Sequence, residues 1–344
     1  MFDFLRTNLN NIRPVAPKQQ KSATVSRVYP NLRPLEKDTV SFSGLDKNKM
    51  ITDKTYYGGA GPKVRKLLAE AEEPRKEFER TLKKILAPYC CFDNNLPTHD
   101  FGRLVFNKKS ERSLREKFVS REISDVEEAK NEIRDIIRGR IILDNPNTTE
   151  GANYICSALT KAVNEKKIKI VNIKSYYEMD KRYTNGEDLQ YIPLKSLLKL
   201  DNAVTAKYGE SAFKSGTSRE NGYNAVHIIF ELQNGYYAEL QIMGKNVEKV
   251  KEMEDILYKI KGNKTIPPKY REVQEAYDKY VKGKPARERE LSEYTRRVYN
   301  AQRLKELEKY PNIEQKEFLP LPINSKLPRI FDFNNLAKIY RSKD

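Results

Sequence analysis

The 344-residue chain has few of the residues that build metal centres and disulfide frameworks. Its two histidines, His99 and His227, are too few for a histidine-rich metal centre. Its three cysteines offer neither a set of disulfides nor the spacing of a zinc site, which favours a reducing, cytoplasmic setting. No apolar run approaches the length that spans a membrane, and residues 1–15 lack the apolar stretch of a secretory signal. We therefore expect a cytoplasmic protein without a membrane span.

Charge is what the chain has in abundance. Lys and Arg number 65 against 48 Asp and Glu, which gives a formal net charge of +17. Hydrophobic residues make up 38%, and the mean hydropathy is −0.78. This balance is typical of a well-solvated protein with one sizeable α/β domain and helical extensions, and the positive charge favours acidic partners.

The most informative local pattern is a predicted β-hairpin. Two runs with alternating side chains, residues 225–232 and 236–243, flank Asn234-Gly235, which is a strong short-range turn signal. In such a hairpin every second residue lies on the same face of the sheet.

This alternation places Tyr223 and His227 on one face of the first strand, and Glu239 and Gln241 together on one face of the second. An aromatic ring, an imidazole and a carboxylate that can hold Mg²⁺ are what a nucleotide and its metal require. Two interpretations remain open: either a binding site lies over these polar residues, or they lie on a solvated sheet face.

A dense cationic segment precedes the hairpin, at residues 107–117. Ser110 or Ser113 could cap a helix that begins here, and free N–H groups at such a helix end attract phosphate. Lys109 and Lys117 are two helical turns apart, so they could bind different phosphates of one nucleotide. The alternative is a solvated basic helix.

Next along the chain, a predicted capping box at 124–127 leads through a short helix into an apolar strand within 134–143. Asp135 is at the change from helix to strand, where it could join Glu239 as a second carboxylate for Mg²⁺. Strict alternation puts Asp135 and Arg140 on opposite faces, so they converge only if Asp135 precedes the regular strand.

Four segments in this order resemble the RelA/SpoT-type (p)ppGpp synthetase family. The family patterns that they match include Lys-x-Asn-Gly-Tyr-x-Ser-x-His and Glu-x-Gln-x-Arg. The four segments are Asn107–Lys117, Asp135–Arg140, Arg219–His227 and Glu239–Met243. The resemblance covers about residues 100–260 and implies an α/β (α+β) fold with a nucleotidyltransferase-like mixed sheet flanked by helices.

The resemblance also implies the reaction, which is Mg²⁺-dependent transfer of the β,γ-pyrophosphate of ATP to the ribose 3′-hydroxyl of GDP or GTP, making (p)ppGpp. Asp135 and Glu239 would be the catalytic and metal-binding residues, and Glu239 would also help to activate the attacking hydroxyl. The implied ATP-binding residues are Lys109, Ser110, Lys117 and Arg140. The implied acceptor-binding residues are Arg219, Asn221, Tyr223, His227, Gln241 and Glu254. Tyr223 would stack on the base, and Arg219 and His227 would contact phosphates.

The chain departs from the family pattern at three positions. Asn107 and Met243 stand where the family has arginine, and Asp255 stands where it has histidine. With only two histidines, the chain lacks the phosphohydrolase centre of the family's long bifunctional members, so we expect synthesis rather than hydrolysis.

The sequence divides into four predicted parts. Residues 1–54 read as a disordered tail, 55–100 as a helical lead-in, 101–262 as the synthetase domain with an insertion at about 180–216, and 263–344 as a basic helical extension. Within the domain, the apolar spacing of residues 152–163 predicts a crossover helix between two parallel, paired strands.

The C-terminal extension interleaves tyrosines with basic residues. These tyrosines, which are Tyr270, Tyr277, Tyr280, Tyr294 and Tyr299, either stack on RNA or pack the helices onto the domain. Besides a synthetase, a toxic relative that modifies the 3′ end of tRNA and a non-catalytic nucleotide- or RNA-binding module remain open. The candidate partners are ATP, GDP or GTP, tRNA or other RNA, a second copy of the chain and an antitoxin.

Overall fold

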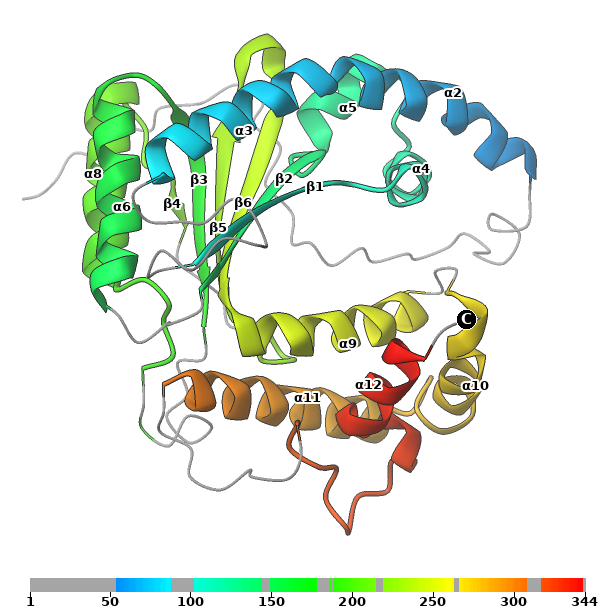
Figure 1. The fold of residues 1–344 in the computed structure, drawn as a ribbon. Coiled ribbons are helices and arrows are strands. Elements are labelled where there is room, and N and C mark those ends of the chain that lie inside the picture. Colours follow the sequence, from blue (N-terminus) through cyan, green and yellow to red (C-terminus); the bar gives the residue numbers. More distant parts are fainter. Residues whose placement is uncertain are drawn as a thin grey trace, which may run out of the picture. The chain divides into compact units, whose positions relative to one another are not determined.

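A mixed six-stranded sheet in the order β1-β2-β6-β5-β3-β4 organises the fold (Figure 1). The strands are β1 Arg103–Lys108, β2 Ile137–Leu143, β3 Lys169–Tyr176, β4 Phe213–Lys214, β5 Ala225–Glu231 and β6 Tyr237–Gly244. β2 pairs with β6, and β3 with β4, in parallel, while the other pairs are antiparallel. The prediction of a mixed sheet flanked by helices is confirmed.

This computed structural model describes residues 54–87, 102–143, 149–177, 186, 188–214, 219–262, 266–307 and 317–342, all within the unit Met50–Asp344. Its helices are α2 Lys54–Glu70, α3 Glu72–Leu86, α4 Glu111–Ser120, α5 Val126–Glu132, α6 Thr149–Asn164, α8 Leu194–Tyr208, α9 Lys245–Lys261, α10 Arg271–Tyr280, α11 Pro285–Glu306 and α12 Phe333–Arg341. Short 3-10 turns lie at Gln233–Gly235, Pro268–Tyr270 and Arg329–Phe331. The predicted tail falls outside the described residues, except that α2 begins at its last residue, Lys54.

The predicted hairpin is confirmed as β5 and β6, which pair antiparallel around the turn at Asn234 and Gly235. Both turn residues have a positive φ, 63° and 75°, a conformation that asparagine and glycine tolerate best. The Leu232 N–H donates to the Tyr236 carbonyl at 2.7 Å and closes the turn.

The two faces of the sheet differ in chemistry. On the apolar face, Phe78 of α3 packs against Phe106 of β1 and Phe230 of β5, with ring centroids 6.1 and 5.2 Å away. Ala238, Leu240 and Ile242 of β6 are fully buried, as expected from the alternation. The opposite face carries the polar residues of the predicted site.

The crossover helix is confirmed as α6, but the predicted pairing of its flanking strands is wrong. β2 and β3 run in the same direction, yet β6 and β5 lie between them in the sheet. The strand next to β2 is β6, the second strand of the later hairpin, which pairs with β2 in parallel.

A second correction concerns α5, whose N-cap is Asp125 rather than Ser124. The Asp125 carboxylate accepts from the Glu128 N–H at 2.9 Å, and Glu128 in turn accepts from the Ser124 N–H at 2.7 Å.

The predicted insertion forms part of the sheet domain. α8 packs against α6, and β4 extends the sheet beside β3 (Figure 1). The buried carboxylate of Asp201 on α8 accepts from the backbone N–H groups of Ala212 and Phe213 at 2.7 and 2.9 Å. This contact fastens β4 to the helix.

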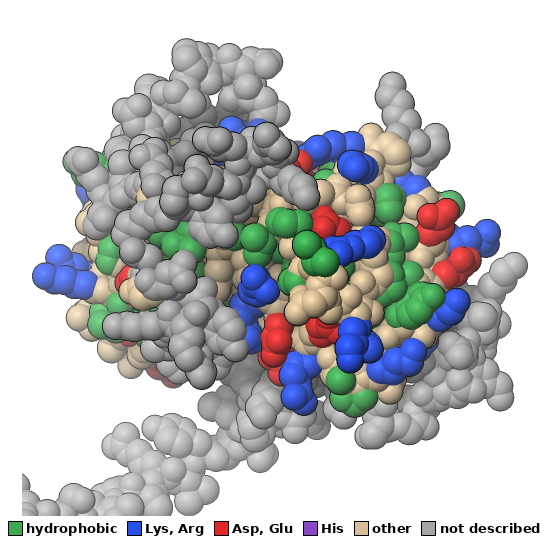
Figure 2. Space-filling view, turned by 90° about the horizontal axis from the view of Figure 1, so that it is seen from below, with side chains coloured by type: hydrophobic (Ala, Val, Ile, Leu, Met, Phe, Trp, Pro, Cys, Tyr) green, Lys and Arg blue, Asp and Glu red, His purple; other side chains and the backbone are tan. Residues whose placement is uncertain are grey.

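The C-terminal helices pack as one layer with α9, which α11 and α12 both contact (Figure 1). Of the five tyrosines named above for this extension, Tyr280 is 40% exposed. The buried ones are Tyr270, Tyr277, Tyr294 and Tyr299. Figure 2, seen from this side, shows acidic, basic and hydrophobic side chains interspersed. These tyrosines therefore pack the helices, and do not form a row of exposed rings for RNA bases.

None of the helices in the described ranges is long and apolar enough to cross a membrane.

Candidate functional site

A chain of polar contacts runs across the covered face of the hairpin. The His227 ring bonds to the Glu239 Oε1 atom through Nδ1 at 2.9 Å and to the Tyr223 hydroxyl through Nε2 at 2.8 Å. The Gln241 amide donates to the other carboxylate oxygen, Glu239 Oε2, at 2.6 Å. Antiparallel register places His227 directly opposite Gln241, which brings these groups together.

The solvated-face interpretation of the hairpin is wrong. Glu239 is 8% exposed and Gln241 is 6% exposed. Burial acts to raise the pKa of the Glu239 carboxyl, but His227 and Arg138 lower it to about 2, so the group is an anion at neutral pH. A buried carboxylate surrounded by hydrogen-bonding partners is a feature of functional sites.

Arg138 extends this chain to the neighbouring strand. β2 and β6 pair in parallel with Arg138 opposite Glu239, and the Arg138 Nε atom is 3.6 Å from Glu239 Oε2. The same guanidinium binds the Asp135 carboxylate through Nη2. Arg138 therefore joins the two predicted catalytic carboxylates. Sequence reasoning missed this residue, although it is on the same strand face as Arg140, two residues later.

Asp135 collects two further cations. It lies in the turn two residues before β2, so it precedes the regular strand and is not bound by its alternation. Lys109 Nζ is 2.5 Å from Asp135 Oδ2, and Lys117 Nζ is 2.9 Å from Asp135 Oδ1. The two lysines do converge, as predicted, but on a carboxylate.

Burial acts to raise the pKa of Asp135, but the charges of Arg138, Lys109 and Lys117 hold it well below its usual range. Burial lowers the pKa of the Lys109 ammonium to about 7, and the positive charges of Arg138 and Lys117 act in the same direction. The carboxylate of this cluster is thus an anion, and the lysines are close together because of it.

The other two predicted ATP-binding residues have their own partners. Ser110 caps α4, since its hydroxyl oxygen accepts from the Ser113 N–H at 3.2 Å. Arg140 does not reach Asp135, and instead pairs with Glu248 of α9 at 2.7 Å. Arg140 therefore binds the sheet to α9.

The predicted acceptor side is a cluster of rings. The guanidinium of Arg219 lies over the ring of Tyr176 at 4.7 Å and over that of Tyr223 at 5.2 Å. The Tyr223 ring also packs against Tyr176, His227 and Tyr299, and is buried. The predicted stacking surface of Tyr223 is thus covered by side chains in this structure.

Two polar residues complete this side. The Asn221 amide donates to the Glu254 carboxylate at 3.1 Å. Burial raises the pKa of the Glu254 carboxyl to about 7, and the neighbouring Asp255 acts in the same direction. The structure thus brings Glu254 to the loop that precedes β5, as the acceptor assignment requires.

The three departures from the family pattern lie in different surroundings. Asn107 is exposed on β1, Met243 is fully buried at the end of β6, and Asp255 pairs with Lys251 at 3.1 Å. Met243 therefore serves the core where the family has a charged side chain.

Asp135 and Glu239 suit Mg²⁺ in kind, because both supply oxygen ligands. The described residues contain no group of three or more His, Cys, Asp or Glu side chains that could hold a metal ion. Two carboxylates fit a Mg²⁺ ion that arrives with a nucleotide, since the substrate phosphates then supply the remaining ligands.

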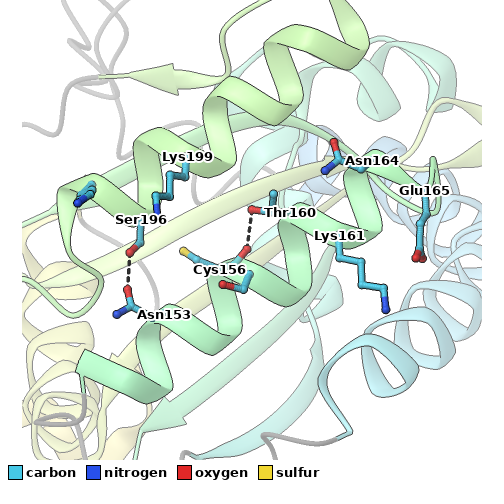
Figure 3. A pocket seen from close by; sticks show the side chains of 10 residues that line it. Asn153, Cys156, Thr160, Lys161, Asn164, Glu165, Ser196 and Lys199 are labelled. Atoms are coloured by element: carbon cyan, nitrogen blue, oxygen red, sulfur yellow. Dashed lines mark hydrogen bonds between the residues drawn. The ribbon is translucent and has the colours of Figure 1, made fainter.

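A separate hollow of about 690 Å³ lies between α6 and α8 (Figure 3). Lys161 and Lys199 line it from the two helices, together with Cys156. Burial raises the pKa of the Cys156 thiol to about 12, which keeps it protonated and unreactive. None of the predicted site residues lines this hollow.

No family model matches the chain, and no curated protein matches it. Among solved structures, it is similar to small alarmone synthetase 1 of Bacillus subtilis bound to its product pppGpp, with 16% identity, 71% of this chain and 95% of that chain covered, and a TM-score of 0.37. A GTP pyrophosphokinase family protein of Streptococcus pneumoniae has 15% identity, 71% and 94% coverage, and a TM-score of 0.32. A protein of Streptococcus mutans UA159 has 15% identity, 67% and 86% coverage, and a TM-score of 0.31.

Proposed function

We propose that this chain is a pyrophosphokinase of the (p)ppGpp synthetase type, which transfers the β,γ-pyrophosphate of ATP to the 3′-hydroxyl of GDP or GTP. The observation that carries the proposal is the continuous polar chain on one covered sheet face. It runs from Lys109 and Lys117 through Asp135, Arg138 and Glu239 to His227 and Tyr223. Phosphoryl transfer requires mainly positioning and charge neutralisation, and this chain supplies both.

On the donor side, Lys109 and Lys117 are already held close together by their shared carboxylate. The polyphosphate of ATP offers the same two ammonium groups a larger negative charge. When ATP binds, we expect the two lysines to release Asp135 and to bind phosphate oxygens instead. Each hydrogen bond to Asp135 that is lost is replaced by a charge-assisted hydrogen bond to phosphate.

That exchange leaves the Asp135 carboxylate without two of its three cationic partners. Asp135 and Glu239 would then hold Mg²⁺, which polarises the phosphoryl oxygens and neutralises the charge that develops on them. Arg138 lies between the two carboxylates in the free protein, so it would release at least one of them when both hold the ion.

At the reacting atoms, the acceptor 3′-oxygen forms a bond to the β-phosphorus as the bond from that phosphorus to the α,β-bridging oxygen breaks. AMP leaves, and the 3′-hydroxyl loses its proton. Glu239 is an anion and is hydrogen-bonded to His227, so this pair is the base that takes the proton.

The test is incubation of the purified protein with γ-labelled ATP and Mg²⁺, with GDP, GTP, AMP, ATP and bulk tRNA as separate acceptors. Label on GDP or GTP supports the proposal. Label on an adenosine nucleotide would change the acceptor, and label on tRNA would indicate a toxin that modifies tRNA. Absence of label on every acceptor, together with measurable nucleotide binding, would contradict enzymatic transfer and favour a binding module.

A further inference from the structure

The hydroxyl of Tyr299 is a buried polar group that no described residue satisfies. Tyr299 is on α11, its side chain is 0% exposed, and its hydroxyl has no hydrogen-bond partner among the described residues. Leaving such a group unsatisfied costs stability, so it calls for a reason. A ligand that binds to this hydroxyl is one such reason.

Tyr299 lies at the predicted acceptor side. Its ring packs edge-on against Tyr223, with centroids 6.0 Å apart and an interplanar angle of 88°. The charged groups of Glu254, Asp255 and Arg219 act on its hydroxyl electrostatically. Tyr299 thus belongs to the same cluster as the residues assigned to the acceptor, although it comes from the C-terminal extension.

The backbone of α11 also touches the loop that carries Tyr223. Gly222 has a φ of +76°, and a Cβ atom at this position would lie 2.6 Å from the Cα atom of Arg296. Helix and loop are therefore in contact at a point where only glycine fits. α11 covers the acceptor loop from outside the sheet.

A buried ion pair fixes α11 in this place. Arg303 and Glu306 near its end are buried and lie 3.3 Å apart. Glu306 accepts from the N–H groups of Asn246 and Val247 at the start of α9, at 2.7 and 3.1 Å. Separating these buried groups would leave charges without partners, so α11 is a fixed wall and not a lid that opens readily.

We propose that α11 forms one wall of the acceptor site and that the Tyr299 hydroxyl is a specificity-determining group that binds the acceptor nucleoside. This inference rests on the proposed function, since it takes the neighbouring Tyr223 as the acceptor side. The C-terminal extension thereby becomes part of the substrate site instead of a surface for RNA.

The chemistry of the cluster suits the planar base of the acceptor nucleotide. The planar guanidinium of Arg219 lies on the rings of Tyr176 and Tyr223, where a planar base would stack. When Arg219 turns towards the acceptor phosphates, a base can take its place on these rings. It then lies next to Tyr299 and Glu254, which offer a hydroxyl and a carboxylate to its polar edge.

The test uses Tyr299→Phe, which keeps the ring and removes the hydroxyl. Binding of GDP to the full chain is measured by calorimetry, and ATP binding is measured in parallel. We expect the GDP dissociation constant to rise about 5- to 10-fold, because one buried hydrogen bond is lost, with ATP affinity unchanged. The unfolding midpoint without nucleotide should stay the same or rise, because an unsatisfied group has been removed.

Tyr294→Phe is the matched control on the same helix. The Tyr294 hydroxyl donates to the Leu319 carbonyl at 3.0 Å and accepts from the Phe333 N–H at 3.1 Å. This variant should lower the unfolding midpoint and leave GDP binding unchanged.

Unchanged GDP binding in Tyr299→Phe would overturn the inference, and so would a wild-type chain that binds no GDP. The readout is separate from that of the proposed function. Suppose that Tyr299→Phe weakens GDP binding, but the wild-type protein transfers no label. The role of α11 as a wall of the acceptor site would then stand, and the assignment as a transferase would not.

Discussion

The two sides of the site differ in chemistry, since one consists of charged side chains and the other of aromatic rings. The proposed donor side is a cluster of charges in which Lys109, Lys117 and Arg138 surround Asp135. The proposed acceptor side is a cluster of rings around Tyr223 with a carboxyl, that of Glu254, whose pKa is raised to about 7. A charged ligand can replace one set of ion pairs with another at little cost, whereas a base must displace side chains that already pack together.

This difference gives the two sides different sensitivities. Interactions between charges weaken with salt, and each buried charge needs a partner of opposite sign. Ring packing depends on shape and on the few polar groups among the rings. Glu239 belongs to both sides, because Arg138 connects it to Asp135 and His227 connects it to Tyr223.

The largest effect should come from the residue that both sides share. Glu239→Gln removes the negative charge and the proposed base while keeping the size of the side chain. We expect the rate of transfer to fall about 10³-fold, which corresponds to about 4 kcal/mol of transition-state stabilisation. The measurement is the turnover of γ-labelled ATP to product. Glu231→Gln, at the far end of the same hairpin where Glu231 pairs with Lys169, is the control and should keep its activity. Wild-type turnover in Glu239→Gln would remove the assignment of Glu239.

The second effect breaks the donor side alone. Asp135→Asn removes the anion that Lys109, Lys117 and Arg138 share, and loss of one partner from a buried ionic cluster costs about 3 kcal/mol or more. Urea unfolding should show this loss of free energy, and ATP should recover part of it by supplying a new anion. Asp125→Asn is the control, because asparagine also caps a helix and stability should hardly change. Equal unfolding curves for Asp135→Asn and the wild type would mean that the cluster does not bear on stability.

The sequence was sufficient for what is local. The hairpin was predictable because Asn234-Gly235 and the alternating residues on either side determine both the turn and the faces, and the convergence of Glu239 with His227 follows from that register. Lys109 and Lys117 converge as predicted, but helical spacing is not the reason, because Lys109 precedes the N-cap of α4, and their common partner could not be predicted either.

Contacts between distant segments were not accessible in this way. Arg138 faces Glu239 only because β6 pairs with β2, and the same pairing made the predicted neighbour of β2 wrong. Tyr299 lies on Tyr223 because α11 packs against α9 and against the loop before β5, which no pattern within α11 indicates. Strand order and helix docking depend on packing across the whole domain, so local periodicity cannot determine them.

The third effect concerns the acceptor side and depends on pH. The pKa of Glu254 is raised to about 7, so the folded state binds this proton more strongly than the unfolded state, in which the pKa is about 4.3. The stability that this group contributes is present below the unfolded pKa and is lost as the pH rises to about 7. Glu254→Gln has no charge to bury, so its free energy of unfolding should exceed that of the wild type by about 3 to 4 kcal/mol at pH 8 and should equal it near pH 4. Urea unfolding at both pH values checks this, and a difference that does not depend on pH would contradict the buried ionisation of Glu254.

The smallest effect separates the two roles of Arg219, which covers the rings in the free protein and is assigned to the acceptor phosphates. Arg219→Gln should weaken GDP binding about tenfold through the lost charged contact, but should leave guanosine binding unchanged or tighter, because guanosine has no phosphate and the rings are less covered. Calorimetry with the two ligands measures the difference. Arg134→Gln removes another guanidinium that lies over a tyrosine, 5.3 Å from the Tyr237 ring, and should affect neither ligand. If Arg219→Gln weakened the binding of both ligands equally, Arg219 would contact the base instead of being displaced by it. The acceptor side would then be a preformed pocket. It would differ even more from the donor side, where a ligand must exchange existing ion pairs.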